Sequence, residues 1–365
     1  MLNRGVGHSS IYGQAGAHLH NAPRLRRTAF AGALLAPILM SLMAAPATAR
    51  GPLGSRDADL QMAVTQAHKR YKADRSGKIP DTVPALTKIS PDLYGVVIVR
   101  VDGKIYQAGD AGIPFVLAAV ATPFAAALVA EQQGADVLAR KIGVAAGPPA
   151  VAATQPVAAS EGSNNPLDWE GSIATISLVQ PQNDVDAKWR AVLGNLGSFA
   201  GRELFLDESM YRSASGARDT VLEAARQLAG QGRLYDDAAA TADLYVKQGA
   251  VTLTARDLAI MAATFANGGI NPVNGRVVVK PEVSQNIQAL ITSAGLRGGT
   301  GAWMYKIGIP AVAGKSGAII AVVPGRMGIA TYSPPLDAGG ISVRGQRAIK
   351  YLGQALQISL YPNWQ

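Results

Sequence analysis

The chain has 365 residues, 48% hydrophobic and only 16% charged, so it can bury a large core and form one or two folded domains. It contains no cysteine, which excludes thiol nucleophiles, disulfides and thiolate metal sites. The formal net charge is +9, and four of the arginines lie in the first 49 residues. Without these four the net charge is +5, and the remaining basic residues form no long run. We therefore expect solvated surface cations rather than a face that binds nucleic acid.

The first 49 residues are typical of an export signal. Arginines precede an apolar run over residues 29–45, and a small-x-small cleavage site follows at residues 47–49. The run is near the minimum length of a membrane anchor, but Pro37 and the small-residue end favour cleavage. We expect a periplasmic or secreted protein with no membrane contact after cleavage, and both the general and the twin-arginine export route stay open.

His68 is the only histidine after this leader. A multi-histidine metal site is therefore excluded, and we expect neither a metal nor a cofactor. The residue lies in a polar amphipathic stretch, residues 63–72, which predicts a short helix with His68 on its surface. Any hydrolysis would then depend on Ser, Thr, Lys, Tyr or carboxylate groups.

Strand patterns lie near both ends of the remaining chain, with helical patterns between them. Residues 95–101 and 104–107 flank Asp102-Gly103, which predicts a β-hairpin, and two further apolar strands flank Pro324-Gly325. Thr254 and Asp257 form a near capping box for a helix that ends at Asn267. Residues 343–356 predict a final helix with one apolar side.

These patterns predict an α/β (α+β) fold. We expect a discontinuous sheet domain, residues 50–110 and 285–365, with a helical domain, residues 111–284, inserted into it.

Five segments after the leader carry a family resemblance. They read IPDTVPALTKISPDLYGVVIVRVDGKIYQAGD (79–110), NPLDWEGSIAT (165–175), FAGRELFLDESMYRS (199–213), LTARDLAIMAATFANGGINPVNG (253–275) and AVVPGRMGIATYSPPLDAGGISVRG (321–345). Together they resemble the bacterial glutaminases over residues 77–353. The resemblance implies the serine β-lactamase/DD-peptidase architecture, an antiparallel sheet flanked by helices with the site in the cleft beside a helical domain, and a homo-oligomer. These are turn, cap and core segments, so they indicate fold more than chemistry.

A sixth segment, GDAGIPFVLAAVATPF at residues 109–124, resembles the nucleophile segment of that family without its working residues. The family has Ser-x-x-Lys, in which a lysine amine takes the proton of the attacking serine, and these positions are Ala119 and Thr122 here. A methyl group cannot attack, and a threonine hydroxyl cannot act as that base. The resemblance therefore implies that no catalytic residue of the family site is retained.

The dipeptide Thr122-Pro123 also predicts local structure. Proline is costly inside a helix but favourable in its first turn, so the main helix should begin at Thr122 or Pro123, with Thr122 as cap. Ala119 should then lie on a short turn before the helix. On this basis we expect that Ala119→Ser with Thr122→Lys does not restore the pair, because Pro123 disfavours placing both side chains on one face.

The resemblance also places the family's glutamine-binding positions. Two Asn positions of the family are occupied here by Trp169 and Asp219. The Glu that would hold a substrate ammonium is replaced by Ala214, and one Tyr is replaced by Arg297. Only the Tyr of the Leu-Tyr-x-x-Gln segment remains, as Tyr245. Residues 115–160 are rich in Ala, Val and Pro where the family has a polar wall, so they offer few partners to a zwitterion. An unpaired buried amide or ammonium costs several kcal/mol, so we expect the site to select against glutamine. The alternative is that this stretch is a flexible linker.

The Lys-Ser-Gly strand of such clefts is out of register. An ungapped count from Pro324 places Val312 and Ala313 where the family has Lys and Ser, whereas Lys315-Ser316 follows three residues later. Either a shifted strand presents Lys315 to the cleft, or both residues occupy a solvent-facing turn or strand.

We therefore predict an exported glutaminase-like protein that is catalytically inactive at the family site and acts in binding or interaction, with a small amino-acid-like ligand. The alternative is a glutaminase that hydrolyses L-glutamine to L-glutamate and ammonia with relocated groups, for which Lys315-Ser316 and Tyr245 are the candidates.

Overall fold

The computed structural model describes residues 57–81, 83–145 and 165–361. The predicted export signal, residues 1–49, lies outside this part of the chain, so cleavage and localisation stay predictions. None of the helices in the described ranges is long and apolar enough to cross a membrane.

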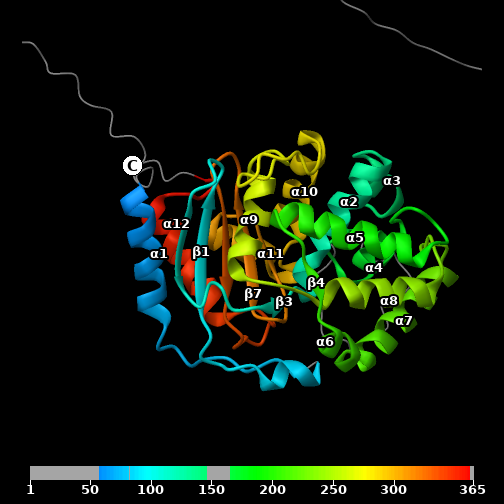
Figure 1. Ribbon diagram of the computed structural model, residues 1–365, viewed down its shortest axis with the longest axis horizontal. Coiled ribbons are helices and arrows are strands. Elements are labelled where there is room, and N and C mark those ends of the chain that lie inside the picture. The colour runs from blue at the N-terminus through cyan, green and yellow to red at the C-terminus, as the bar shows by residue number, and fades with distance from the viewer. Residues whose placement is uncertain (1–56, 82, 146–164, 362–365) are drawn as a thin grey trace, which may run out of the picture. The chain divides into compact units, whose positions relative to one another are not determined.

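A five-stranded antiparallel sheet brings the two ends of the described chain together (Figure 1). Its order is β2-β1-β8-β7-β6, with β1 at Gly95–Arg100, β2 at Ile105–Gly109, β6 at Ala311–Ala313, β7 at Ala318–Val323 and β8 at Met327–Tyr332. The predicted hairpin is confirmed, since β1 pairs with β2 around Asp102-Gly103, and the two strands predicted on either side of Pro324-Gly325 are β7 and β8, which also pair. The strands β1 and β8 are far apart in the sequence but pair along their whole length, from Gly95 opposite Tyr332 to Arg100 opposite Met327.

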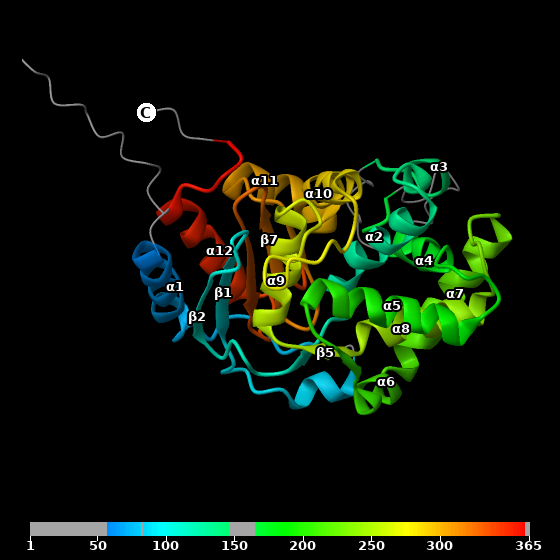
Figure 2. The ribbon, with the colours of Figure 1, turned by 45° about the horizontal axis from the view of Figure 1, so that its top comes forward.

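Helices cover both faces of this sheet. On one face lie α1 (Asp57–Tyr71) and α12 (Val343–Leu356), which contact each other and share an apolar core with one side of the strands. On the other face α9 (Ala255–Ala266) lies across β8, β1 and β7 (Figures 1 and 2). A Cβ at Gly328 of β8 would lie 2.2 Å from the backbone nitrogen of Ala263, so only glycine allows α9 to approach so closely.

The remaining helices form a second cluster beside the sheet (Figure 2). They are α2 (Thr122–Gln133), α3 (Val137–Lys141), α4 (Trp169–Ser177), α5 (Val185–Ala200), α6 (Glu208–Ser213), α7 (Ser215–Gly230) and α8 (Ala238–Gly249). The helix α10 (Pro281–Ala294) contacts both α2 and β6, and α11 (Thr300–Ile307) contacts α10 and α12. A three-stranded sheet of order β3-β5-β4, from Phe115–Val116, Val251–Leu253 and Phe205–Leu206, joins the two regions.

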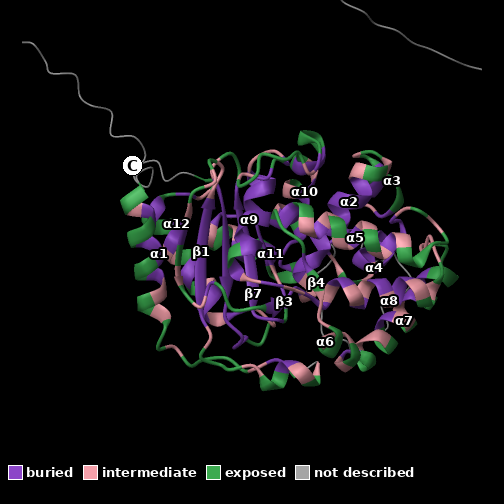
Figure 3. Ribbon diagram, in the orientation of Figure 1, coloured by how far each residue is buried: buried purple, intermediate pink, exposed green. Residues whose placement is uncertain are grey.

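The centre of the helical cluster is α2, which is buried throughout residues 122–130 (Figure 3). It contacts α4, α5 and α10, and Phe124 packs against Phe199 and Phe265. The linker interpretation of residues 115–160 is therefore wrong for residues 115–145, because small and branched side chains here form core rather than loop. Residues 146–160 lie outside the described part.

Two predicted helices agree closely with the structure, whereas α1 begins at Asp57, before the start predicted at residue 63. The final helix spans Val343–Leu356 as expected, and Thr254 caps α9 in a reciprocal capping box with Asp257. The predicted mixed fold with an antiparallel sheet is confirmed. Its division into domains at residues 111 and 284 stays a prediction, and α9, which falls in the second range, covers the sheet.

Two local predictions are corrected. His68 is half-buried rather than on the surface, because its ring stacks on Tyr94 at a centroid distance of 4.9 Å. The helix does begin at Thr122 after a 3-10 turn, Ala118–Ala121, but the residue in the capping position is Ala121, and Thr122 is already helical.

Candidate active site

A cavity of about 430 Å³ lies where the helical cluster meets the turn between β6 and β7. Its wall is built by the 3-10 turn before α2, the first residue of α4, the junction of α6 and α7, the end of α8, the short 3-10 helix Arg297–Gly299, and Lys315. These elements are far apart in the sequence, so only the tertiary fold makes one site of them.

Seven of the nine candidate site residues named from the sequence line this cavity: Ala119, Thr122, Trp169, Ala214, Tyr245, Arg297 and Lys315. Of the other two, Ser316 is absent from the lining, and Asp219 is exposed on α7 outside it, although its neighbour Thr220 belongs to the lining. Successive residues of a helix point in directions about 100° apart, which separates these two side chains. The structure thus assembles the predicted positions, while the role of each stays a prediction.

The nucleophile position of the family lies on a strained turn. Ala118 has φ 49°, in the left-handed region that a residue other than glycine rarely adopts. Ala119 and Thr122 follow in the 3-10 turn and the first turn of α2, and both line the cavity. In a 3-10 turn, side chains three apart eclipse one another. Our expectation that Pro123 keeps these two positions off a common face is therefore wrong.

Tyr245 contributes a phenol hydroxyl from α8. It shares a hydrogen bond of 3.3 Å with the hydroxyl of Ser172, and its ring meets the edge of Trp169 at 5.8 Å between centroids. Burial raises the pKa of Tyr245, and the bond from Ser172 and the charge of Arg297 offset this only in part. The hydroxyl is therefore a neutral hydrogen-bond donor near neutral pH.

Lys315 reaches the cavity from a turn, not from a strand. The strand β6 ends at Ala313, and the turn is closed by the N–H of Gly314 donating to Ala318 O at 3.0 Å, so the shifted-strand interpretation is wrong. A Cβ at Gly314 would lie 2.8 Å from Val120 Cγ2, and this close approach sets the turn against the Ala118–Ala121 segment. Lys315 is exposed, as expected for a turn, whereas Ser316 is 1% exposed.

Gln248 was missed as a separate site residue. It lines the cavity, is 2% exposed, and its Oε1 has no hydrogen-bond partner among the described residues. The signal was present, because Gln248 ends the LYVKQ segment whose Tyr245 was singled out.

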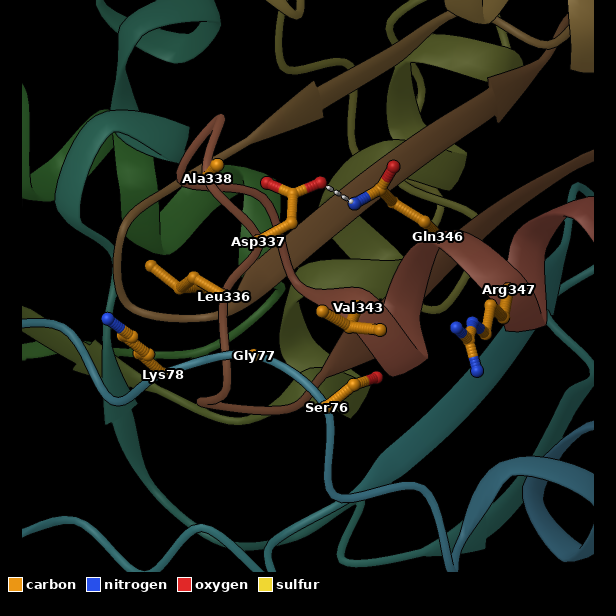
Figure 4. Close-up of a pocket in the computed structure, with 9 residues that line it drawn as sticks. All are labelled: Ser76, Gly77, Lys78, Leu336, Asp337, Ala338, Val343, Gln346 and Arg347. Carbon is orange, nitrogen blue, oxygen red and sulfur yellow. Dashed lines mark hydrogen bonds between the residues drawn. The ribbon is translucent and has the colours of Figure 1, made fainter.

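A second cavity, of about 660 Å³, lies at the start of α12 (Figure 4). It is lined from two sides by residues 76–78 and by residues of the Leu336–Arg347 region. Asp337 accepts a hydrogen bond of 2.7 Å from Gln346, and Arg347 pairs with Asp74. Most of its charge is therefore already engaged within the protein, and none of the predicted site residues lies there.

The family model for glutaminase matches residues 77–361. The chain therefore belongs to the glutaminase family, as its resemblance implied. It is 39% identical over 299 residues to glutaminase 2 of Yersinia pestis, covering 82% of this chain and 88% of that protein, and 36% identical over 314 residues to a glutaminase of Mycobacterium ulcerans (strain Agy99), covering 85% and 97%. The solved structure described as probable glutaminase ybaS is similar with a TM-score of 0.80 at 33% identity, over 84% of this chain and 99% of that one.

These relatives overturn our prediction of a catalytically inactive binding protein. That prediction rested on the loss of the nucleophile and base and of most glutamine-binding positions, whereas the similarity to proteins named glutaminase extends over more than four fifths of the chain. The findings favour the alternative prediction, a glutaminase with relocated catalytic groups.

Proposed function

We propose that this chain hydrolyses a side-chain carboxamide of the glutamine class to a carboxylate and ammonia, with groups other than a Ser-x-x-Lys pair. The observation that carries the proposal is the cavity beside Ala119, which gathers Thr122, Tyr245, Arg297 and Lys315 in a chain whose relatives are named glutaminases.

The attacking oxygen in this proposal belongs to a water molecule. Ala119 has no nucleophilic atom, and Thr122 Oγ1 donates its proton to Ala119 O at 3.0 Å rather than to a side-chain base. Water adds to the amide carbon, the C–N bond breaks, and the nitrogen leaves as ammonia with one proton from that water. The carboxylic acid then gives the second proton to the ammonia, which leaves a carboxylate and an ammonium ion.

The remaining polar groups have complementary roles. The cationic side chains of Lys315 and Arg297 attract an anionic substrate, and the one nearer the amide stabilises the negative charge that develops on its carbonyl oxygen, which is commonly the largest catalytic term. Tyr245, kept neutral by burial, donates a hydrogen bond to the same oxygen or to the leaving nitrogen. Ser316 has less support than Lys315 and Tyr245, because it is buried and absent from the cavity lining.

The expected turnover is slow. When a catalytic nucleophile is absent, charge stabilisation and binding alone leave roughly 10³- to 10⁴-fold acceleration over water. The assay therefore needs high protein concentration and long incubation, with L-glutamate quantified by mass spectrometry, because spontaneous cyclisation of glutamine also releases ammonia.

The test compares the purified protein with Lys315→Met and Tyr245→Phe, and with Lys306→Met as a matched control, since Lys306 is exposed on α11 outside the cavity. Glutamate formation that falls in the two cavity variants and persists in the control supports the proposal. Glutamate formation no faster than in a protein-free blank, or equal in all four proteins, contradicts hydrolysis of L-glutamine itself.

We also propose that residues 1–49 direct export and are removed, supported by their arginines, apolar run and cleavage-site pattern. Mass spectrometry of protein from the periplasm or medium should find Arg50 as the first residue. Full-length protein in the membrane fraction would indicate an anchor instead. The homo-oligomer implied by the family stays a proposal that light scattering after gel filtration tests.

A further inference from the structure

We propose that the cavity is selective for a carboxylic acid without an ammonium group, so that the amide hydrolysed there is the ω-amide of such an acid rather than an amino acid. This inference rests on the proposed function for the reaction, but its binding part stands on the charges of the cavity alone.

Two cationic side chains enter the cavity from different elements. Arg297 begins the 3-10 helix Arg297–Gly299, and Lys315 lies on the turn between β6 and β7. Neither takes part in an ion pair within residues 57–81, 83–145 and 165–361. Two unpaired cations that line one concave site attract an anionic ligand.

Arg297 is held at this place by a strained turn. Its φ is 53°, in the left-handed region, and Thr300 Oγ1 bridges the turn by donating to Arg297 O at 2.7 Å and accepting from Leu296 N at 2.9 Å. A strained backbone persists only where the surroundings determine it, and it is common at ligand sites. The backbone position from which the Arg297 side chain extends is thus fixed by the fold.

The described cavity lining contains no carboxylate to receive an ammonium group. Ala214 stands where the family resemblance places a Glu, and Asp219 is exposed outside the lining. The nearby carboxylate of Asp243 already accepts a hydrogen bond from Tyr211 and pairs with Lys247 at 2.9 Å. Within the described lining, the ammonium of an amino acid would therefore meet two like charges and no carboxylate, and the one unpaired amide oxygen there, Gln248 Oε1, is neutral and buried, which disfavours its binding.

Aliphatic and aromatic side chains form much of the rest of the wall. Val116, Met210, Val221 and Val246 contribute aliphatic surface, and Trp169 is 40% exposed at the cavity. A volume of about 430 Å³ is within the ordinary range of small-molecule sites and exceeds what a five-carbon acid fills. The ligand class that fits is a carboxylate with an aliphatic or aromatic body and a terminal carboxamide.

Binding of glutaramate and of L-glutamine, which differ only by the α-ammonium, tests the inference by titration calorimetry at low salt. We expect glutaramate to bind at least tenfold more tightly. Arg297→Gln and Lys315→Met should each weaken glutaramate binding about five- to tenfold, the order of one partly exposed ion pair. Arg297→Lys keeps the charge and should retain most of the affinity.

The matched controls make the same substitutions at exposed cations outside the cavity. Lys306→Met on α11 and Arg190→Gln on α5 remove exposed cations outside this cavity and should leave glutaramate affinity unchanged. Ala214→Glu restores a carboxylate to the wall, and it should shift the preference toward L-glutamine. Thermal unfolding of each variant shows whether it is folded.

These measurements can contradict the proposed hydrolysis and the proposed ligand selectivity independently of each other. If glutaramate binds selectively but neither amide yields a carboxylate product, the proposed hydrolysis fails and the binding inference stands. If L-glutamine binds as tightly as glutaramate, or if the Arg297 and Lys315 variants bind glutaramate unchanged, the inference is overturned whether or not glutamate is formed.

Discussion

Thr122 Oγ1 donates a hydrogen bond of 3.0 Å to the carbonyl oxygen of Ala119, and both residues line the same cavity. Their side chains lie three residues apart across the end of a 3-10 turn, the spacing at which such a turn eclipses them. The scaffold of a Ser-x-x-Lys pair is therefore present without its two functional groups.

The double substitution Ala119→Ser with Thr122→Lys should raise the rate of glutamate formation at least tenfold, since loss of such a unit costs on the order of 10⁶-fold. Either single substitution should give little gain, because serine needs the base and lysine needs the nucleophile. The assay is the mass-spectrometric one described above. A folded double variant with unchanged turnover would show that Pro123 or the buried site of Thr122 prevents the pair from forming.

Thr122→Val removes the hydroxyl and keeps the shape of the side chain. If water attacks the amide, glutamate formation should change by less than about tenfold, because only the bond to Ala119 O is lost. Ala119→Val is a suitable comparison, since it adds bulk at the neighbouring cavity position without touching the hydroxyl. Loss of all turnover in Thr122→Val alone would identify the threonine as the nucleophile.

Tyr245→Phe should lower turnover about tenfold or more, within the range of a lost hydrogen-bond donor in the transition state. Burial raises the pKa of Tyr245 above its ordinary value of 10.0, so its protonated form persists to higher pH than that of a free tyrosine. In the pH–rate profile of the unmodified protein, any loss from this group should therefore have its midpoint above pH 10. A fall with a midpoint below pH 10 that disappears in Tyr245→Phe would contradict its assignment as a neutral donor.

The carboxylate of Asp257 takes part in the capping box of α9 and also forms an ion pair with Arg202. It accepts hydrogen bonds from Thr254 and from Arg202, at 2.8 Å to Nε and 2.6 Å to the terminal nitrogen. Burial opposes its ionisation, but the bonds from Arg202 and Thr254 outweigh burial and hold the pKa of Asp257 below 3.8. Asp257→Ala should lower the free energy of unfolding by about 2 kcal/mol at neutral pH.

The loss of stability in Asp257→Ala should depend on pH in one direction. A depressed folded-state pKa contributes stability above the unfolded value near 3.8, and the contribution disappears as the pH falls through the folded value. Urea unfolding should show the two proteins converging below about pH 4, whereas Asp186→Ala, an exposed change in the first turn of α5, should have little effect. A constant difference down to pH 2 would argue against the ionised role.

Local sequence determined the elements whose signals lie within a few residues. The α12 helix, the α9 capping box, the β1–β2 hairpin and the strands β7 and β8 followed from apolar periodicity, cap residues and turn dipeptides, because these act over one or two turns of chain. The start of α2 after a 3-10 turn followed in the same way from Pro123. The family resemblance, likewise, came from turn and core segments.

Only the tertiary structure decided what these elements place together. His68 looked exposed in its own helix, but Tyr94 from the segment before β1 covers it. Lys315 and Arg297 are separated from Thr122 by more than 170 residues, and Gly314 and Thr300 set the two turns that bring them to one cavity. The charged side chains of that cavity come from separate elements. The ligand selectivity that we propose for it therefore depends on how those elements pack together, and no local sequence pattern predicts it.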